Sequence, residues 1–176
     1  MTLEVRTLTG PEVPRVWTID RREHIAGIYR LRDGQLVLEP HDFEVPGWKP
    51  GQEEETTPRL LALVARGGSA SAFYDGDTLV AAAFVDVEPA GSSRDLIKFD
   101  WLHVSRDYRG RGLGGLLLER AKAFARQRGA GGLYISSAPT ENTVNFYIAH
   151  GAKLAAEPDP ELFAFEPEDI HLEWRP

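Results

Sequence analysis

The chain contains no cysteine and only one methionine among its 176 residues. The absence of cysteine excludes disulfide bonds, zinc–thiolate sites and a cysteine nucleophile. No apolar run is long enough to span a bilayer, and the first residues, MTLEVRTLTG, lack the pattern of a secretory signal peptide. These absences predict a protein of the reducing cytoplasm that does not cross a membrane.

Positive charge is also scarce, because 20 Lys and Arg residues stand against 27 Asp and Glu, for a net charge of −7 at pH 7. Binding to nucleic acid depends on neutralising phosphates, so this balance argues against a nucleic-acid partner and suits small cationic partners. The five histidines are scattered without ligand spacing, and no metal is predicted. The length and the 42% hydrophobic content predict one globular domain over residues 1–176.

The first third of the chain mixes several patterns. Residues 3–8 alternate apolar and polar side chains, which predicts a half-buried strand. The apolar residues between 11 and 32 suggest one or two helices. Four prolines between residues 39 and 58 predict a long loop, since proline interrupts both helices and central strands. Residues 59–67 are expected to form a short helix that ends at a glycine.

The remainder of the chain predicts a mixed α/β sheet with helices packed on it. A hairpin signal, Asp75-Gly76-Asp77, joins two of the strands. The expected strands cover 71–74, 78–87, 95–104, 132–137, 153–157 and 169–174, and the expected helices cover 113–129 and 140–150. The buried stripe expected on the first of these helices consists of Leu113, Leu116, Leu117, Ala121, Phe124 and Ala125.

A glycine-rich turn, GRGLGG at residues 110–115, separates the strand at 95–104 from the helix at 113–129. Glycines let a backbone approach a ligand closely, and the first turn of a helix has unpaired N–H groups that attract anions. The turn therefore predicts a phosphate site. No Lys follows the glycines, which excludes a P-loop. The sequence Gly110-x-Gly112-x-x-Gly115 matches the dinucleotide-binding motif G-x-G-x-x-G. That motif, however, follows the first strand of a doubly wound sheet, and this turn does not.

Two stretches resemble the signatures of the GNAT N-acetyltransferase superfamily. Arg109-x-x-Gly112-x-Gly114, within VSRDYRGRGLG, is similar to the family's acyl-CoA pyrophosphate motif, [RQ]-x-x-G-x-[GA]. NFYIAHGAKL, at residues 145–154, resembles the second signature. The resemblance covers residues 97–154 and implies a mostly antiparallel sheet flanked by about four helices. It also implies that residues 95–154 form the acetyl-CoA core, with the acceptor side formed by 11–67.

The resemblance also implies roles in binding acetyl-CoA. Backbone amides of the glycine turn would hold the pyrophosphate, and the exposed backbone of the preceding strand would bind the pantetheine arm and the thioester carbonyl. At the position of the family's pantetheine-binding asparagine this chain has Thr140, which is predicted to be a helix N-cap. Asn142 or Asn145 would then make the contact with pantetheine. Lys122, Arg126 and Arg128 either meet the 3′-phosphate or form a solvated face. The implied cosubstrate residues are Leu102, His103, Val104, Arg109, Gly110, Arg111, Gly112, Leu113, Gly114, Asn142 and Asn145.

The chemistry implied is direct attack of a primary amine on acetyl-CoA in a ternary complex. Tyr147 matches the family tyrosine that protonates the departing thiolate, a role that suits a phenol at neutral pH. The family has no fixed base, and the position of its commonest strand glutamate is Lys98 here. Asp100 lies two residues further on the same strand face and is the leading candidate for the base. Glu23, in the predicted N-terminal helix, and His103 come next.

The acceptor is the least determined part. Residues 16–29 and the predicted proline-rich loop would border it, and acidic and aromatic residues of that loop suit a cationic amine such as a polyamine, an aminoglycoside or a lysine side chain. A solvated loop without that role is the alternative. The final strands of this family often help to form a homodimer. The rival functions are a non-catalytic acyl-CoA-binding module and, more distantly, a nicotinamide enzyme.

Overall fold

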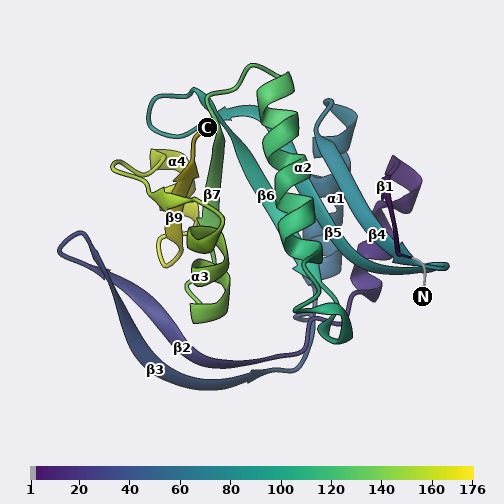
Figure 1. The fold of residues 1–176 in the computed structure, drawn as a ribbon, viewed down its shortest axis with the longest axis horizontal. Coiled ribbons are helices and arrows are strands. Elements are labelled where there is room, and N and C mark those ends of the chain that lie inside the picture. Colours follow the sequence, from purple (N-terminus) through teal and green to yellow (C-terminus); the bar gives the residue numbers. More distant parts are fainter. Residues whose placement is uncertain (1–2) are drawn as a thin grey trace.

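The computed structural model describes residues 3–176 and contains a seven-stranded sheet (Figure 1). The strands lie in the order β1-β4-β5-β6-β7-β9-β8. Within this sheet the β6–β7 pair is parallel and the other pairs are antiparallel, so the predicted mostly antiparallel sheet is confirmed. The strands are β1 (Leu3–Thr7), β4 (Ser69–Asp75), β5 (Thr78–Ala90), β6 (Leu96–Val104), β7 (Leu133–Ser137), β8 (Lys153–Leu154) and β9 (Ile170–Trp174).

The two parallel strands separate soon after they meet. Ile97 pairs with Leu133 and Lys98 with Tyr134, and the described pairing of β6 with β7 ends there. Since β6 continues to Val104, its C-terminal half lies beside β7 without a ladder between them. Figure 1 shows β6 and β7 diverging towards the end of the sheet at which α2 begins.

Helices cover both faces of the sheet (Figure 1). The face carrying α2 (Leu113–Gln127) and α3 (Glu141–Ala149) lies opposite the face covered by α1 (Gln52–Ala65). A 3-10 helix at 10–18 packs against α1, a second one at 106–108 precedes the glycine turn, and α4 (Pro160–Phe165) leads into β9. Among the described residues, no helix is long and apolar enough to cross a membrane.

Among the described residues this layering produces two large hydrophobic cores, one on each face of the sheet, beside a small cluster of Ala90, Leu96 and Tyr134. Successive side chains of a strand point to opposite faces, so neighbouring residues enter different cores. Phe73 belongs to the core under α2, whereas Tyr74 belongs to the core under α1. On β6, Phe99 lies in the first core and Trp101 in the second. Both faces of the central strands are therefore buried.

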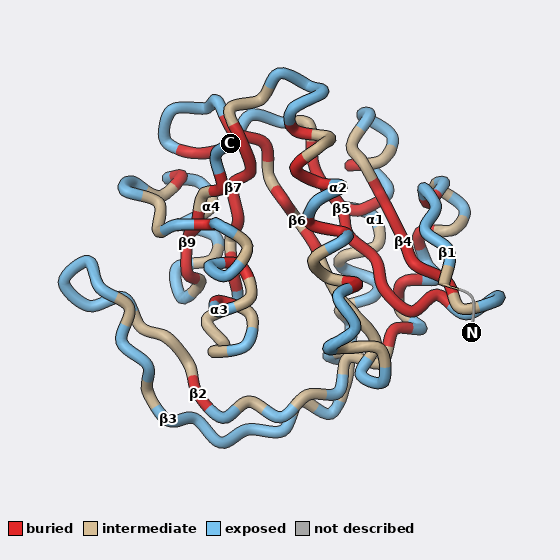
Figure 2. Tube along the Cα trace, in the orientation of Figure 1, coloured by how far each residue is buried: buried red, intermediate tan, exposed pale blue. Residues whose placement is uncertain are grey.

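A long hairpin arm, made of β2 (Glu23–Arg32) and β3 (Gln35–Val45), forms a second sheet outside the main one. Figure 1 shows it curving past the end of the sheet towards α3, and Figure 2 shows that much of β3 is exposed. Tyr29 ties the arm to α3. Its N–H donates to the carbonyl of Pro139 at 2.7 Å, and its hydroxyl donates to Oδ1 of Asn145 at 2.8 Å.

This arm overturns the predictions for residues 11–58. The predicted helices at 11–32 are a 3-10 helix followed by β2, and the predicted loop is largely β3 and the start of α1. Pro40 is accommodated beside a register irregularity in a sheet of only two strands, where proline is tolerated. Pro58 lies inside α1. The arm is a half-exposed two-stranded ribbon. Its apolar residues therefore do not form a buried face, and their spacing gave a wrong prediction of helix.

Two further expectations need correction. The buried stripe of α2 contains Leu118, whereas Leu116 is 54% exposed and Phe124 is only partly buried. The helix is therefore rotated relative to the predicted face. α4 was not predicted because it has only six residues and begins within the Pro-Asp-Pro stretch at 158–160. Asp159 begins it by accepting hydrogen bonds from the N–H groups of Glu161 and Leu162 at 3.0 and 3.1 Å.

Candidate active site

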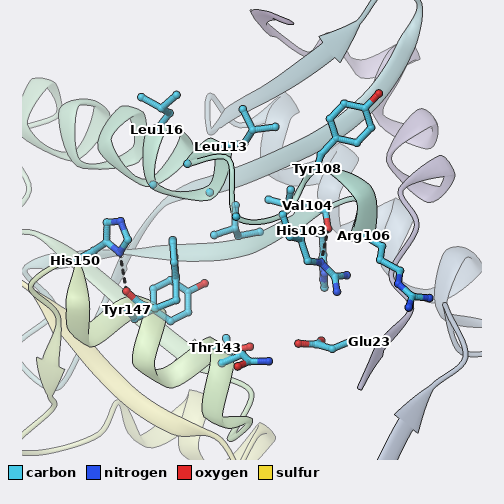
Figure 3. A pocket seen from close by; sticks show the side chains of 18 of the residues that line it. Glu23, His103, Val104, Arg106, Tyr108, Leu113, Leu116, Thr143, Tyr147 and His150 are labelled. Carbon is cyan, nitrogen blue, oxygen red and sulfur yellow. Dashed lines mark hydrogen bonds between the residues drawn. The ribbon is translucent and has the colours of Figure 1, made fainter. Parts of the chain in front are cut away.

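One cavity of about 980 Å³ opens where β6 and β7 diverge, and Figure 3 shows it from close by. The start of α2, the end of β6, one face of α3 and the base of the hairpin arm form its walls. Its lining residues are Arg22, Glu23, His24, Leu102, His103, Val104, Arg106, Tyr108, Arg109, Gly110, Gly112, Leu113, Gly114, Gly115, Leu116, Glu119, Asn142, Thr143, Phe146, Tyr147 and His150.

The glycine turn forms the wall at the start of α2. Gly110 and Gly112 adopt left-handed conformations, with φ of 73° and 80°, and Gly112 is the N-cap of α2. Residues with a Cβ rarely adopt such angles, which explains glycine at these two positions. The unpaired N–H groups of the first helical turn begin here, at the cavity. The predicted phosphate turn therefore has the geometry of an anion site.

Arg109 has a bracing role that its sequence motif did not reveal. Its Nε donates to the carbonyl of Val104 at 3.0 Å, and its Nη1 donates to the carbonyl of Arg22 at 3.0 Å. Nη2 reaches the carbonyl of Asp20 at 3.4 Å. The side chain thus holds the turn against both β6 and the base of the arm. Arg111 does not line the cavity, and its guanidinium lies 4.9 Å from the ring centre of Tyr108.

The end of β6 supplies Leu102, His103 and Val104 to the cavity wall, as predicted for the strand that borders the thioester. The ring of His103 lies 4.8 Å from that of Trp48 and 4.5 Å from that of Trp101. Burial, with Arg21 and Arg109 nearby, lowers the pKa of His103 to about 3. The imidazole is therefore neutral near pH 7.

A β-bulge decides the position of Asp100. The pairing of β5 with β6 shifts between Phe84–Trp101 and Val85–Phe99, so Asp100 is the extra residue. Its side chain is only 4% exposed and forms ion pairs with Arg59 and, at 3.2 Å, with Lys98. Asp100 and Lys98 share a face as expected. However, Asp100 is not among the residues that line the cavity.

Tyr147 lies where the second signature predicted a proton donor. The residue is 7% exposed and lines the cavity from α3, and its ring packs edge-on against Phe99 at 6.1 Å. Burial raises the pKa of the phenol well above its ordinary value, so the hydroxyl keeps its proton at neutral pH. Figure 3 shows Tyr147 on one side of the cavity, with His103 and Glu23 on the other.

Of the two asparagines on α3 that were candidates for the pantetheine contact, one lines the cavity and the other does not. Asn142 lines the cavity, together with Thr143. Asn145 does not line it, and its side chain instead accepts the hydrogen bond from Tyr29 of the arm. Thr140 occupies the N-cap position, but its hydroxyl donates to that of Thr143 at 2.8 Å rather than accepting from a backbone N–H.

The basic residues further along α2 point elsewhere. Lys122 is buried, and its Nζ donates to Glu119 at 2.7 Å and to the carbonyl of His150 at 2.8 Å. Arg126 lies over the ring of Trp174, and Arg128 donates to a backbone carbonyl at 2.7 Å. These three residues are not in the cavity lining, and Lys122 is not part of a solvated face either.

Several lining residues were not assigned from the sequence. Glu119 lies on α2 and His150 is the C-cap residue of α3, and the sequence analysis gave neither residue a role. Arg22 directly precedes the arm and His24 lies at its start, in a segment that was predicted as helix, so their position could not be foreseen. In the described part of the chain, no group of three or more acidic, His or Cys residues is arranged to hold a metal ion.

The comparisons decide the family. The sequence profile of the Acetyltransferase (GNAT) family matches residues 15–152. The chain belongs to the GNAT acetyltransferase family. It is therefore an acyltransferase, as the two signatures implied. A comparison with curated proteins finds no match.

Solved structures of GNAT enzymes share the fold. Nourseothricin acetyltransferase is 17% identical, with a TM-score of 0.72 and 99% of each chain covered. A protein of Bacillus anthracis str. Ames assigned as a streptothricin acetyltransferase, in complex with acetyl coenzyme A, is 14% identical with a TM-score of 0.75, again over 99% of each chain. PaiA N-acetyltransferase of Thermoplasma acidophilum, in complex with coenzyme A, is 14% identical with a TM-score of 0.67, and both chains are fully covered.

Proposed function

We propose that this protein transfers the acetyl group of acetyl-CoA to a primary amine by direct attack in a ternary complex. The observation that carries the proposal is the continuity of the cavity. A single space joins the glycine turn, the end of β6, which pairs with β5 but no longer with β7, and the hydroxyl-bearing side chain of Tyr147. A phosphate site, a strand edge and a proton donor in one cavity are what acyl transfer from a CoA thioester requires.

Acetyl-CoA fits the cavity in one direction. Its pyrophosphate would accept hydrogen bonds from backbone amides between Gly110 and Gly114, at the positive end of the α2 dipole. Its pantetheine arm would lie along the backbone of Leu102–Val104, whose strand has left its partner β7. Two of the similar structures contain acetyl-CoA or CoA, which supports this cosubstrate.

The thioester would then lie between β6 and Tyr147. A backbone N–H of β6 would polarise the thioester carbonyl as negative charge develops on its oxygen. Tyr147 would donate its phenolic proton to the departing thiolate. With no cysteine in the chain, no cysteine can carry the acetyl group as a thioester, and direct attack by the amine is the simpler route.

We propose a cationic amine as the acceptor. The chain carries a net charge of −7, and carboxylates gather on the arm and on the segment after α4, including Asp42, Glu44, Glu166 and Glu168. The ion pair between Arg30 and Glu168 joins these two regions. The names of two similar structures refer to nourseothricin and streptothricin, so these two compounds are first probes beside polyamines and aminoglycosides.

Thermal unfolding with acetyl-CoA, NAD and ATP tests the cosubstrate first. A ligand at about 100 times its Kd adds about 2.7 kcal/mol to the free energy of unfolding, which is a shift of several degrees for a domain of this size. Stabilisation by acetyl-CoA alone is expected. The release of free thiol is then followed with a streptothricin, a polyamine and an aminoglycoside. Stabilisation by NAD instead, or binding of acetyl-CoA without transfer to any amine, would contradict the proposal.

A further inference from the structure

The described lining of the cavity includes two carboxylates, Glu23 and Glu119. Glu119 is neutralised by the buried Lys122, whose Nζ lies 2.7 Å from its Oε1. Within residues 3–176, by contrast, Glu23 makes no ion pair and its carboxylate no side-chain hydrogen bond. A carboxylate at the wall of an active-site cavity that is held by no ion pair or side-chain hydrogen bond is available for a substrate amine.

The position of Glu23 suits a role in the reaction. Glu23 is the first residue of β2 and pairs with Val45 at the base of the arm. Figure 3 shows its carboxylate pointing into the space between the arm and α3, on the side of the cavity opposite Tyr147. An acid and a base on opposite walls leave room between them for the thioester carbon and the attacking nitrogen.

The other candidate bases are occupied or unsuitable. Asp100 is held by Arg59 and Lys98 and lies outside the lining. His103 faces the cavity, but burial and two arginines disfavour its protonated form so strongly that it is a poor proton acceptor at neutral pH. His24 has one ring nitrogen 2.7 Å from Glu44 and the other 3.5 Å from Asp42.

We propose that Glu23 is the general base of the acetyl transfer, an inference that rests on the proposed function. Glu23 removes one proton from the substrate ammonium, and the freed nitrogen lone pair forms the C–N bond at the thioester carbon. The C–S bond then breaks, and the thiolate takes the proton of Tyr147. The second proton lost from nitrogen returns through solvent to the Tyr147 phenolate, and Glu23 releases its proton to water.

Several cationic side chains lie on the cavity walls near Glu23. Arg22 and His24 are its chain neighbours and line the same cavity, and Arg106 and Arg109 line it from the turn after β6. Arg21 also interacts with Glu23, whose charge opposes the lowering of the Arg21 pKa by burial. His103 is neutral, and Thr143, the labelled α3 residue that lies across from Glu23 in Figure 3, is uncharged. Glu23 therefore meets cations and neutral groups on these walls.

The test compares wild type with Glu23→Gln, and uses Glu39→Gln as a matched change elsewhere on the arm. Acetyl transfer to each amine probe is measured from pH 6.5 to 9.5, after thermal unfolding has shown that both variants are folded and bind acetyl-CoA. At pH 7 we expect kcat/KM of Glu23→Gln to fall about 10²- to 10⁴-fold. The deficit should shrink as the pH approaches the pKa of the amine, because the amine then arrives already deprotonated.

Glu39→Gln should follow the wild-type pH profile, since Glu39 pairs with Arg30 and Arg32 and lies outside the cavity lining. A deficit of Glu23→Gln that is the same at every pH would assign Glu23 a structural role and overturn the inference. Unchanged kcat/KM at pH 7 would overturn it as well. Acetyl-CoA binding without transfer to any probe by the wild type would overturn the proposed function, and this inference with it.

Discussion

Asp169 makes stability depend on pH in an unusual direction. Burial raises the pKa of its carboxyl from 3.8 to about 6, the charge of Glu166 adds to the rise, and Lys98 opposes it. Between about pH 4 and pH 6 the folded protein therefore holds a proton that the unfolded chain has released. The stability linked to this proton is complete below about pH 4 and is lost as the pH rises through 6.

Asp169→Asn removes this dependence while preserving the shape of the side chain. The two pKa values differ by about 2 units, and about 1.4 kcal/mol per unit sets an upper limit of about 3 kcal/mol. Solvent reaches part of the side chain, so screening reduces the expected gain to about 1–2 kcal/mol above pH 7. With about 2–4 °C per kcal/mol at this chain length, the variant should melt about 2–8 °C above wild type at pH 8.

The assay is thermal unfolding of both proteins at pH 5, 6, 7 and 8, followed by tryptophan fluorescence. The difference in Tm should be largest at pH 8 and should narrow towards pH 5. Glu168→Gln removes an exposed carboxylate one residue away and should show no comparable trend. A difference that does not change with pH, or a variant less stable than wild type at pH 8, would refute the reasoning.

Three further changes test other parts of the structure. Tyr147→Phe should lower kcat about 10²-fold or more, because the proton donor is lost, and should leave the thermal shift caused by acetyl-CoA unchanged. Loss of the thermal shift together with kcat would instead indicate that Tyr147 acts through packing. Asp159→Ala should lower the free energy of unfolding in urea by about 2–4 kcal/mol. The substitution removes the N-cap of α4 and leaves the buried N–H of Gly91 without its acceptor at 3.0 Å. A decrease of less than about 1 kcal/mol would argue against this hydrogen-bond network. Gly132→Ala should prevent folding, as judged by circular dichroism, since φ is 150° and a Cβ would lie 1.9 Å from the carbonyl of Trp174; a well-folded variant would contradict this geometry.

The sequence predicted the strands and helices of residues 95–154 well for a local reason. The glycine turn, β6 and α2 follow one another directly, so spacing alone places the turn at the start of a helix. Tyr147 was found through a helical signature of ten residues. The prediction of the α2 face still erred at Leu116, because an exposed leucine beside a cavity cannot be told from a core leucine by periodicity.

The segment predicted to border the acceptor was harder to predict, because its geometry depends on contacts between residues far apart in the sequence. Asp100 was placed correctly on the face of Lys98, but its partner Arg59 comes from α1, 41 residues earlier, and the bulge in β6 has no sequence signal. Glu23 was considered as a base, yet in a helix rather than at the start of a strand. Its place in the cavity depends on Arg109, which holds the neighbouring Arg22 carbonyl from 87 residues away.

The base of the arm has a consequence for how this enzyme could diverge. Glu23 and Val45 pair with each other, so the chain leaves and re-enters the domain at nearly one point. A segment with adjacent ends can be exchanged for one of another length or sequence without altering the order of strands in the main sheet. Replacement of residues 24–45 would therefore change one wall of the cavity as a unit while keeping Glu23, and a new acceptor range could arise by transplanting a single hairpin.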